Sequence, residues 1–220
     1  MSNDISAKAA DLLLSVDAVS FRFDPPFTYT SGLLSPIYLD NRLVMSYPDV
    51  RKQVIDLYVQ VIKNEIGLEN VEWISATATA AIPHGAFIAE RLNLPLVYVR
   101  PSTKKYGKAN RLEGYLKEGS KVLVVEDHIS TAESVTGNIE TVRELGGIVD
   151  YVIGTTTYET EKSKKAIVDA KVTLLTLTTG KLIVEHAVEK GVLTEEQKDS
   201  VQDWLSDPEG WGTSFISKAK

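Results

Sequence analysis

The chain has 220 residues, 43% hydrophobic and 25% charged, with a formal net charge of −6 at pH 7 and no cysteine. This is the composition of an ordinary globular domain; the negative charge argues against nucleic acid as the main partner, and the lack of cysteine excludes disulfides and thiolate chemistry. Because no apolar run reaches roughly 18 residues and the first residues lack a signal peptide's basic start and apolar core, we expect a cytoplasmic protein with no membrane partner.

The first third of the chain predicts a helix, short strands and a second helix. Apolar residues near helical spacing predict a helix over residues 5–19, which a proline-rich turn follows. Residues 27–40 have the pattern of two short strands joined through Gly32. The sequence Ser46-Tyr-Pro48 offers a cap with proline in the first turn, so a second helix is expected from there to about residue 66.

From residue 71 onwards, strand patterns alternate with helix patterns, which predicts a parallel sheet with helices on both faces. The expected strands are residues 71–75, 95–99, 121–125, 148–157 and 171–177. The expected helices are residues 82–92, 133–145, a segment between the last two strands, 181–189 and 194–205, the last two of which finish the chain. Residues 100–114 carry few apolar side chains and several charges, so we expect a long mobile loop there.

The most informative segment is residues 122–134, Val-Leu-Val-Val-Glu-Asp-His-Ile-Ser-Thr-Ala-Glu-Ser. An apolar run predicts a buried parallel strand, with Glu126 and Asp127 at its carboxyl end and a hydroxyl-rich loop before a helix. Open α/β sheets bind ligands at this edge, where a helix N-terminus suits a phosphate and carboxylates accept hydrogen bonds from a ribose. The alternative is an acidic strand end followed by an ordinary helix cap. The segment resembles the phosphoribosyl-pyrophosphate (PRPP) signature of type I phosphoribosyltransferases.

Four stretches together resemble the orotate phosphoribosyltransferases, a family of pyrimidine nucleotide synthesis. They are residues 27–42, 77–84, 98–114 and the PRPP segment, and their order and spacing match over almost the whole chain. The PRPP segment alone indicates only a phosphoribosyltransferase. The resemblance of the first stretch indicates that the base accepted is orotate. The resemblance implies an α/β type I phosphoribosyltransferase fold, with a central mostly parallel sheet flanked by helices and a small N-terminal hood. It implies one domain over residues 1–220, in which residues 1–45 and the C-terminal helices contribute to the hood and the periphery.

The chemistry implied by the resemblance is attack of an orotate nitrogen on C1 of PRPP as magnesium pyrophosphate leaves. The product is orotidine 5′-monophosphate, formed through a transition state like an oxocarbenium ion. The protein must therefore position two substrates and stabilise charge on the leaving group. Mg²⁺ is expected on PRPP oxygens and water rather than in an all-protein cage. A homodimer with shared active sites is implied, because the family's mobile loop reaches into the neighbouring subunit's site.

The resemblance also implies roles for individual residues. Lys104 and Asp127 are the expected catalytic residues, Lys104 because it would neutralise charge on the departing pyrophosphate. The expected PRPP-binding residues are Arg100, Lys104, Tyr106, Glu126, Asp127, His128, Ile129, Ser130, Thr131, Ala132, Glu133 and Ser134. The expected orotate-binding residues are Thr30, Ser31, Gly32 and Ser130. Asn41 and Arg42 have an alternative reading, in which they pair structurally with nearby carboxylates.

Several positions depart from the family's pattern. Ala132 stands where glycine, which tolerates a positive φ, is usual, and Glu133 places a carboxylate beside the phosphate site. Tyr106 replaces a loop histidine, Pro101 replaces a lysine of some members, and His128 replaces an apolar residue. These departures keep two alternatives open: a transferase for another base, and a PRPP-sensing regulatory protein without turnover.

Overall fold

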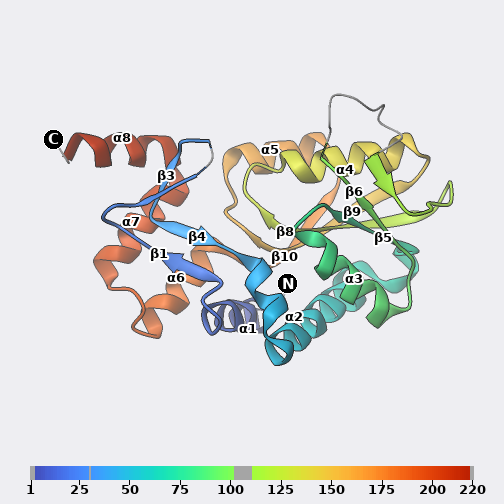
Figure 1. Cartoon of the computed structure of the whole chain (residues 1–220), viewed down its shortest axis with the longest axis horizontal. Coiled ribbons are helices and arrows are strands. Elements are labelled where there is room, and N and C mark those ends of the chain that lie inside the picture. Colours follow the sequence, from blue (N-terminus) through green and yellow to red (C-terminus); the bar gives the residue numbers. More distant parts are fainter. Residues whose placement is uncertain (1–2, 30, 102–110, 219–220) are drawn as a thin grey trace.

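The computed structural model describes residues 3–29, 31–101 and 111–218, which form one six-stranded sheet and two smaller two-stranded sheets (Figure 1). The order of strands in the large sheet is β10-β9-β8-β5-β6-β7. Their bounds are β5 Trp73–Thr77, β6 Leu96–Val99, β7 Leu112–Glu113, β8 Lys121–Ile129, β9 Ile148–Thr157 and β10 Thr173–Thr179. All neighbours are parallel except β6 and β7, so the predicted mostly parallel sheet is confirmed.

Helices cover both faces of this sheet (Figure 1). One layer contains α4 (Glu133–Glu144) and α5 (Glu161–Asp169). The other contains α1 (Asn3–Leu14), α2 (Pro48–Val61), which continues as a π-helical turn over Ile62–Ile66, and α3 (Ala81–Leu92). No described helix is long and apolar enough to cross a membrane.

The central strand β8 shows why the sheet needs both layers. Val122 and Val124 pack in one buried cluster with residues of α4, whereas Leu123 and Val125 pack in the larger cluster with α1–α3. Successive side chains of a strand point to opposite faces, so a strand buried on both faces reads as an unbroken apolar run. The apolar run at residues 122–125 is this pattern.

The connections of the sheet create a crevice at the carboxyl ends of β5 and β8. From β5 the chain crosses through α3 to β6 on one side, and β8 then returns to the other side of β5. Ligands of open α/β sheets bind where the strand order reverses in this way. The acidic pair of β8 lies at that edge.

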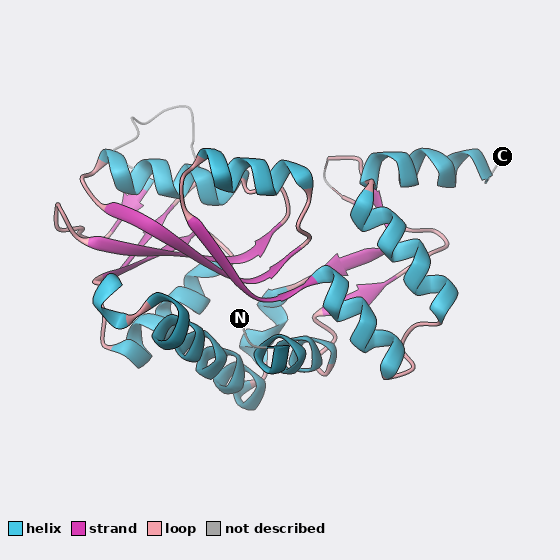
Figure 2. Cartoon of the chain, turned by 180° about the vertical axis from the view of Figure 1, so that it is seen from behind, coloured by secondary structure: helices cyan, strands magenta, loops and turns pink. Residues whose placement is uncertain are grey.

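A second part of the molecule, which we call the hood, consists of residues 19–29 and 31–46 together with the three C-terminal helices. Its elements are β1 (Val19–Phe21), β2 (Phe27–Thr28), β3 (Leu34–Ser35), β4 (Ile37–Leu39), the 3-10 helix η1 (Asn41–Ser46), α6 (Gly180–Glu189), α7 (Glu195–Ser206) and α8 (Pro208–Lys218). The helices lie against the short strands beside the main sheet (Figure 2). The indole N–H of the buried Trp204 in α7 donates to the carbonyl of Leu34 at 2.8 Å. This bond links a C-terminal helix to the N-terminal strands of the hood.

The structure differs from the predictions in several places, and one is strand β7, which lies within the segment 100–114 that we expected to be a loop. Strand β8 continues past Val125 to Ile129, because its polar residues still pair with β9. The first helix ends at Leu14 rather than residue 19, and the chain turns at Asp17, whose φ is 55°. Residues 27–40 form three short strands instead of two, and the unpredicted helix α8 ends the described chain.

Candidate active site

Two cavities lie at the carboxyl end of β8 and share the lining residues His128 and Ser130. The larger one, which we call the hood cavity, has a volume of about 300 Å³, at the small end of the range for ligand sites. It is lined by Tyr29, Tyr38, Leu39, Asp40, Arg42, Ala80, Asp127, His128, Ser130 and Tyr158. A smaller one, the loop cavity, has a volume of about 30 Å³. It is lined by Glu126, His128, Ile129, Ser130, Thr131, Ala132, Glu133, Ser134 and Val135. The structure thus brings the predicted residues of 126–134 together around two adjacent spaces that share His128 and Ser130.

The acidic pair divides between these spaces. Asp127 lines the hood cavity, whereas Glu126 lines the loop cavity and is only 6% exposed. The Glu126 carboxyl accepts a hydrogen bond from the backbone N–H of Asp127 at 3.0 Å. Burial, and then the nearby charge of Asp127, raise the pKa of Glu126 well above its ordinary value. The two carboxyl groups are therefore not equivalent: Glu126 favours the neutral form, and Asp127 faces the open space.

The loop after β8 turns into α4 through Ala132, which has a φ of 65° and a ψ of 6°. This is the left-handed region, which costs an L-residue roughly 1–2 kcal/mol. Ala132, which stands where the family usually has glycine, thus adopts the positive φ that glycine tolerates more easily. The turn leaves the N-terminus of α4 at the loop cavity, and backbone N–H groups at such a terminus favour an anion.

Glu133 sits at this terminus, but its charge has a partner. Its carboxylate lies 2.5 Å from the ammonium of Lys162 in the first turn of α5, and both side chains are mainly exposed. The hydrogen bond and charge of Lys162 lower the pKa of Glu133. Thr160, which caps α5, also donates from its hydroxyl to the carbonyl of Ser130 at 2.9 Å. The start of α5 therefore supports the loop and compensates the negative charge that the sequence placed there.

We expect Lys162→Ala to weaken PRPP binding several-fold, because it leaves the Glu133 carboxylate uncompensated beside the expected phosphate site. Glu133→Gln in the same chain should restore the affinity, and calorimetric titration of PRPP with Mg²⁺ measures both. Lys164→Ala is the matched control, since Lys164 is also in α5 but pairs with Glu161. Equal effects of the two lysine substitutions would show that the Lys162–Glu133 pair has no specific role in binding.

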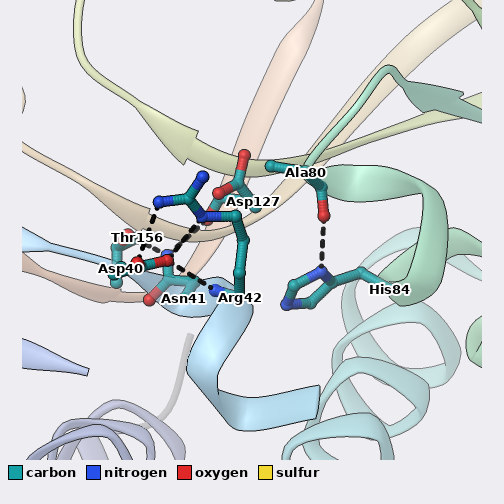
Figure 3. Close-up of polar contacts among 7 residues, drawn as sticks. All are labelled: Asp40, Asn41, Arg42, Ala80, His84, Asp127 and Thr156. Atoms are coloured by element: carbon teal, nitrogen blue, oxygen red, sulfur yellow. Dashed lines mark hydrogen bonds and ion pairs between the residues drawn. The ribbon is translucent and has the colours of Figure 1, made fainter. Parts of the chain in front are cut away.

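A buried polar chain fixes the hood onto the sheet. The amide nitrogen of Asn41 donates to the carbonyl of Asp127 and to the hydroxyl of Thr156, both at 2.7 Å (Figure 3). The same hydroxyl lies 2.8 Å from Nδ1 of His128. Asn41 is fully buried, so these bonds position η1 against β8 and β9 directly beneath the acidic pair. Its role is structural pairing, although with a carbonyl and a hydroxyl rather than a carboxylate.

His128 is held as a neutral ring. Its imidazole packs edge-on against Tyr158 with 4.3 Å between ring centroids, and burial lowers its pKa to about 4. A folded-state pKa below the unfolded value of about 6.5 stabilises the fold above pH 6.5, and this stability is lost as pH falls toward 4. About 2.5 pH units correspond to about 3 kcal/mol.

Between pH 7 and pH 4, the free energy of unfolding of the wild-type protein should fall as His128 takes up a proton. We expect the free energy of unfolding of His128→Val to fall by about 3 kcal/mol less over the same range. Denaturant unfolding at a series of pH values measures this difference. The valine is close to the family's apolar residue and cannot take up a proton. Parallel pH profiles for the two proteins would contradict a neutral buried histidine.

The other predicted residues lie around these cavities or outside the described chain. Arg100 follows β6 and is exposed, with its Nε 3.1 Å from the carboxylate of Glu113. Ser31 and Gly32 form the exposed β2–β3 turn and line neither cavity. Lys104, Tyr106 and Thr30 lie outside the described residues. Within the described ranges, no three His, Cys, Asp or Glu side chains are grouped as a metal site.

Three tyrosines of the hood cavity were not predicted as site residues. Tyr29 and Tyr38 come from the hood, and Tyr158 directly follows β9. The hydroxyls of Tyr29 and Tyr158 lie 3.1 Å apart, and burial raises the pKa of both. They give the cavity an aromatic wall suited to a flat ring. The position of Tyr158 at the carboxyl end of a predicted parallel strand was the available signal.

Comparisons with known proteins agree with this geometry. No model of a protein family matches the sequence. The chain is 42% identical to the orotate phosphoribosyltransferase of Enterococcus faecalis over 208 residues, which is 94% of this chain and 98% of that protein. It is 40% identical to that of Coxiella burnetii over 207 residues, again 94% and 98% of the two chains.

A solved structure extends the similarity to the fold. The orotate phosphoribosyltransferase from Aeropyrum pernix matches with a TM-score of 0.73 and 28% sequence identity, over 84% of this chain and 99% of that one. The predicted type I phosphoribosyltransferase fold is therefore confirmed. With two relatives at 40% identity or more over nearly its whole length, the chain belongs to the orotate phosphoribosyltransferase family.

Proposed function

We propose that this protein transfers the 5-phosphoribosyl group from PRPP to orotate, giving orotidine 5′-monophosphate and pyrophosphate in pyrimidine nucleotide synthesis. The observation that carries the proposal is that the two cavities lie side by side and share two lining residues. The hood cavity has aromatic walls and the size of a small ligand, and the loop cavity has the backbone of an anion site. They share His128 and Ser130, and the acidic pair has one carboxyl group in each. This arrangement supports binding of a base, a ribose and a phosphate in the order that the reaction needs.

The residues take roles that follow from their chemistry. The hydroxyls of the loop and the N-terminus of α4 bind the 5-phosphate in the loop cavity. The carboxylate of Asp127 accepts hydrogen bonds from the ribose hydroxyls and stabilises positive charge that develops on the ring. Ser130 lines both cavities and contacts the base. Arg100 and Lys104 stabilise the leaving pyrophosphate.

Mg²⁺ accompanies PRPP, held mainly by substrate oxygens and water. The support for this is the donor chemistry of the site, because Asp127 presents carboxylate oxygens of the kind that this hard cation prefers. When bound, the ion neutralises charge on the pyrophosphate. The protein's own contribution is to position the ribose over Asp127 and to keep the phosphate on the loop.

The proposed assembly is a homodimer in which Lys104 of each subunit serves the neighbour's site, and the proposed location is the cytoplasm. The resemblance of residues 98–114 to the family's mobile loop supports the first proposal, and the composition without cysteine supports the second.

The test of function is the ultraviolet absorbance of orotate. We expect a loss that requires both PRPP and Mg²⁺, with no turnover of adenine, hypoxanthine or uracil. Equal or faster turnover of a purine would favour a transferase for another base. Tight PRPP binding without turnover of any base would favour a regulatory protein.

A further inference from the structure

The hood cavity contains one cation among the described residues that line it, and that cation is Arg42. The other charged side chains in the lining are Asp40 and Asp127. His128 contributes no charge near pH 7, because burial holds it neutral. The lining therefore carries two carboxylates and one guanidinium, a balance that disfavours an anionic ligand unless Arg42 contacts it directly.

The geometry of Arg42 leaves part of its guanidinium available. Its Nε donates to Oδ1 of Asp40 at 2.6 Å, and its Nη2 donates to Oδ2 at 2.8 Å (Figure 3). A guanidinium has five N–H donors, so this fork uses one edge only. In the described part of the chain, Nη1 has no hydrogen-bond partner, and the side chain is 58% exposed. Asp40 fixes the orientation of the group, and the remaining donors face the side on which Asp127 lies (Figure 3).

Orotate differs from uracil by a carboxylate on the ring, so an orotate site needs a group that distinguishes the two. The aromatic wall of Tyr29, Tyr38 and Tyr158 can stack on either ring. A guanidinium edge, by contrast, matches a carboxylate with two parallel hydrogen bonds.

We propose that Arg42 binds the carboxylate of the base and thereby determines the specificity for orotate, with Asp40 as the residue that positions it. This inference rests on the proposed function and goes beyond it by naming the residue that selects the base. Arg42 is a specificity-determining residue in this proposal, because it contacts the carboxylate of the base and not the reacting atoms. The ion pair with Asp40 would by itself suggest a structural role for Arg42, and binding of the carboxylate adds a functional one.

The test compares orotidine 5′-monophosphate with uridine 5′-monophosphate, which differ only by this carboxylate. Calorimetry measures both affinities for the wild-type protein, Arg42→Ala and Arg42→Lys. We expect Arg42→Ala to weaken binding of orotidine 5′-monophosphate roughly 10- to 100-fold, as for loss of a charge-assisted hydrogen bond, and binding of uridine 5′-monophosphate less than about threefold. Arg42→Lys should give an intermediate ratio, because it keeps the charge but loses the fork.

Arg22→Ala is the matched control, since Arg22 is a hood arginine whose guanidinium lies over Phe27 at 4.4 Å and does not line the cavity. It should leave the ratio of the two affinities unchanged. Parallel losses for both nucleotides in Arg42→Ala, or no loss, would overturn the proposal, and thermal unfolding shows whether each variant is folded. If the wild-type protein turns over orotate but binds both nucleotides equally, only the role of Arg42 fails. If it does not turn over orotate, the proposed function fails first.

Discussion

Asp127→Asn is expected to lower kcat/KM for the orotate reaction by on the order of 10²–10⁴. The carboxylate that lines the hood cavity would lose its charge, and two charge-assisted hydrogen bonds to ribose hydroxyls contribute about 1.5–3 kcal/mol each. The negative charge beside the developing oxocarbenium ion would be lost as well. Initial rates at varied orotate and PRPP measure the effect.

Glu126→Gln is the matched control for this substitution. Burial already favours the neutral form of Glu126, and a glutamine oxygen can still accept the hydrogen bond from the backbone of Asp127. We therefore expect a much smaller loss of kcat/KM than for Asp127→Asn. If the two amides are equally damaging, the two carboxyl groups share one role and the division between the cavities has no functional meaning.

Lys104→Ala is expected to lower kcat by on the order of 10²–10³ with little change in KM for PRPP. Its charge matters most as pyrophosphate departs, so the lost interaction is one made mainly in the transition state. Lys105→Ala, which removes an equal charge from the adjacent position, should have a smaller effect. An effect confined to KM would make Lys104 a binding residue.

The same two substitutions test the proposed shared sites. In a mixed dimer of Lys104→Ala and Asp127→Asn subunits, one site would carry both defects and the other neither. Random exchange between equal amounts of the two should restore roughly a quarter of the wild-type activity. Heterodimers that form without any recovery would contradict a loop that serves the neighbouring subunit.

The sequence predicted the sheet and the position of the loop well, because both depend on local patterns. The strand at residues 148–157 has the predicted bounds, since Val149 and Val152 are buried on one face and Ile153 on the other. The end of β8 could not be predicted in this way. Glu126 and His128 look like the end of a strand by hydrophobicity, yet they pair opposite Gly154 and Thr156 of β9.

Contacts between distant residues were beyond the sequence patterns. The partner of Glu133 is Lys162, which is 29 residues away on another helix. Asn41 reaches Thr156 across 115 residues. Helix α8 was missed because Pro208, Gly210 and Gly212 argue against a helix, and its packing against β3 is a tertiary effect.

The hood has a consequence for how the protein is made. Tyr29 and Tyr38 of the hood cavity come from the first part of the chain. Trp204, which packs against Tyr158 with 5.1 Å between ring centroids, comes from a helix near residue 200. Chains are synthesised from the N-terminus at roughly 5–20 residues per second, so β8 and its loop leave the ribosome well before α7. A nascent chain can thus assemble the loop that follows β8 before Trp204 supports Tyr158 in the wall of the hood cavity. The hood cavity is therefore completed only after α7 has been synthesised, and a chain cut short after α5 would lack the support that Trp204 gives to Tyr158.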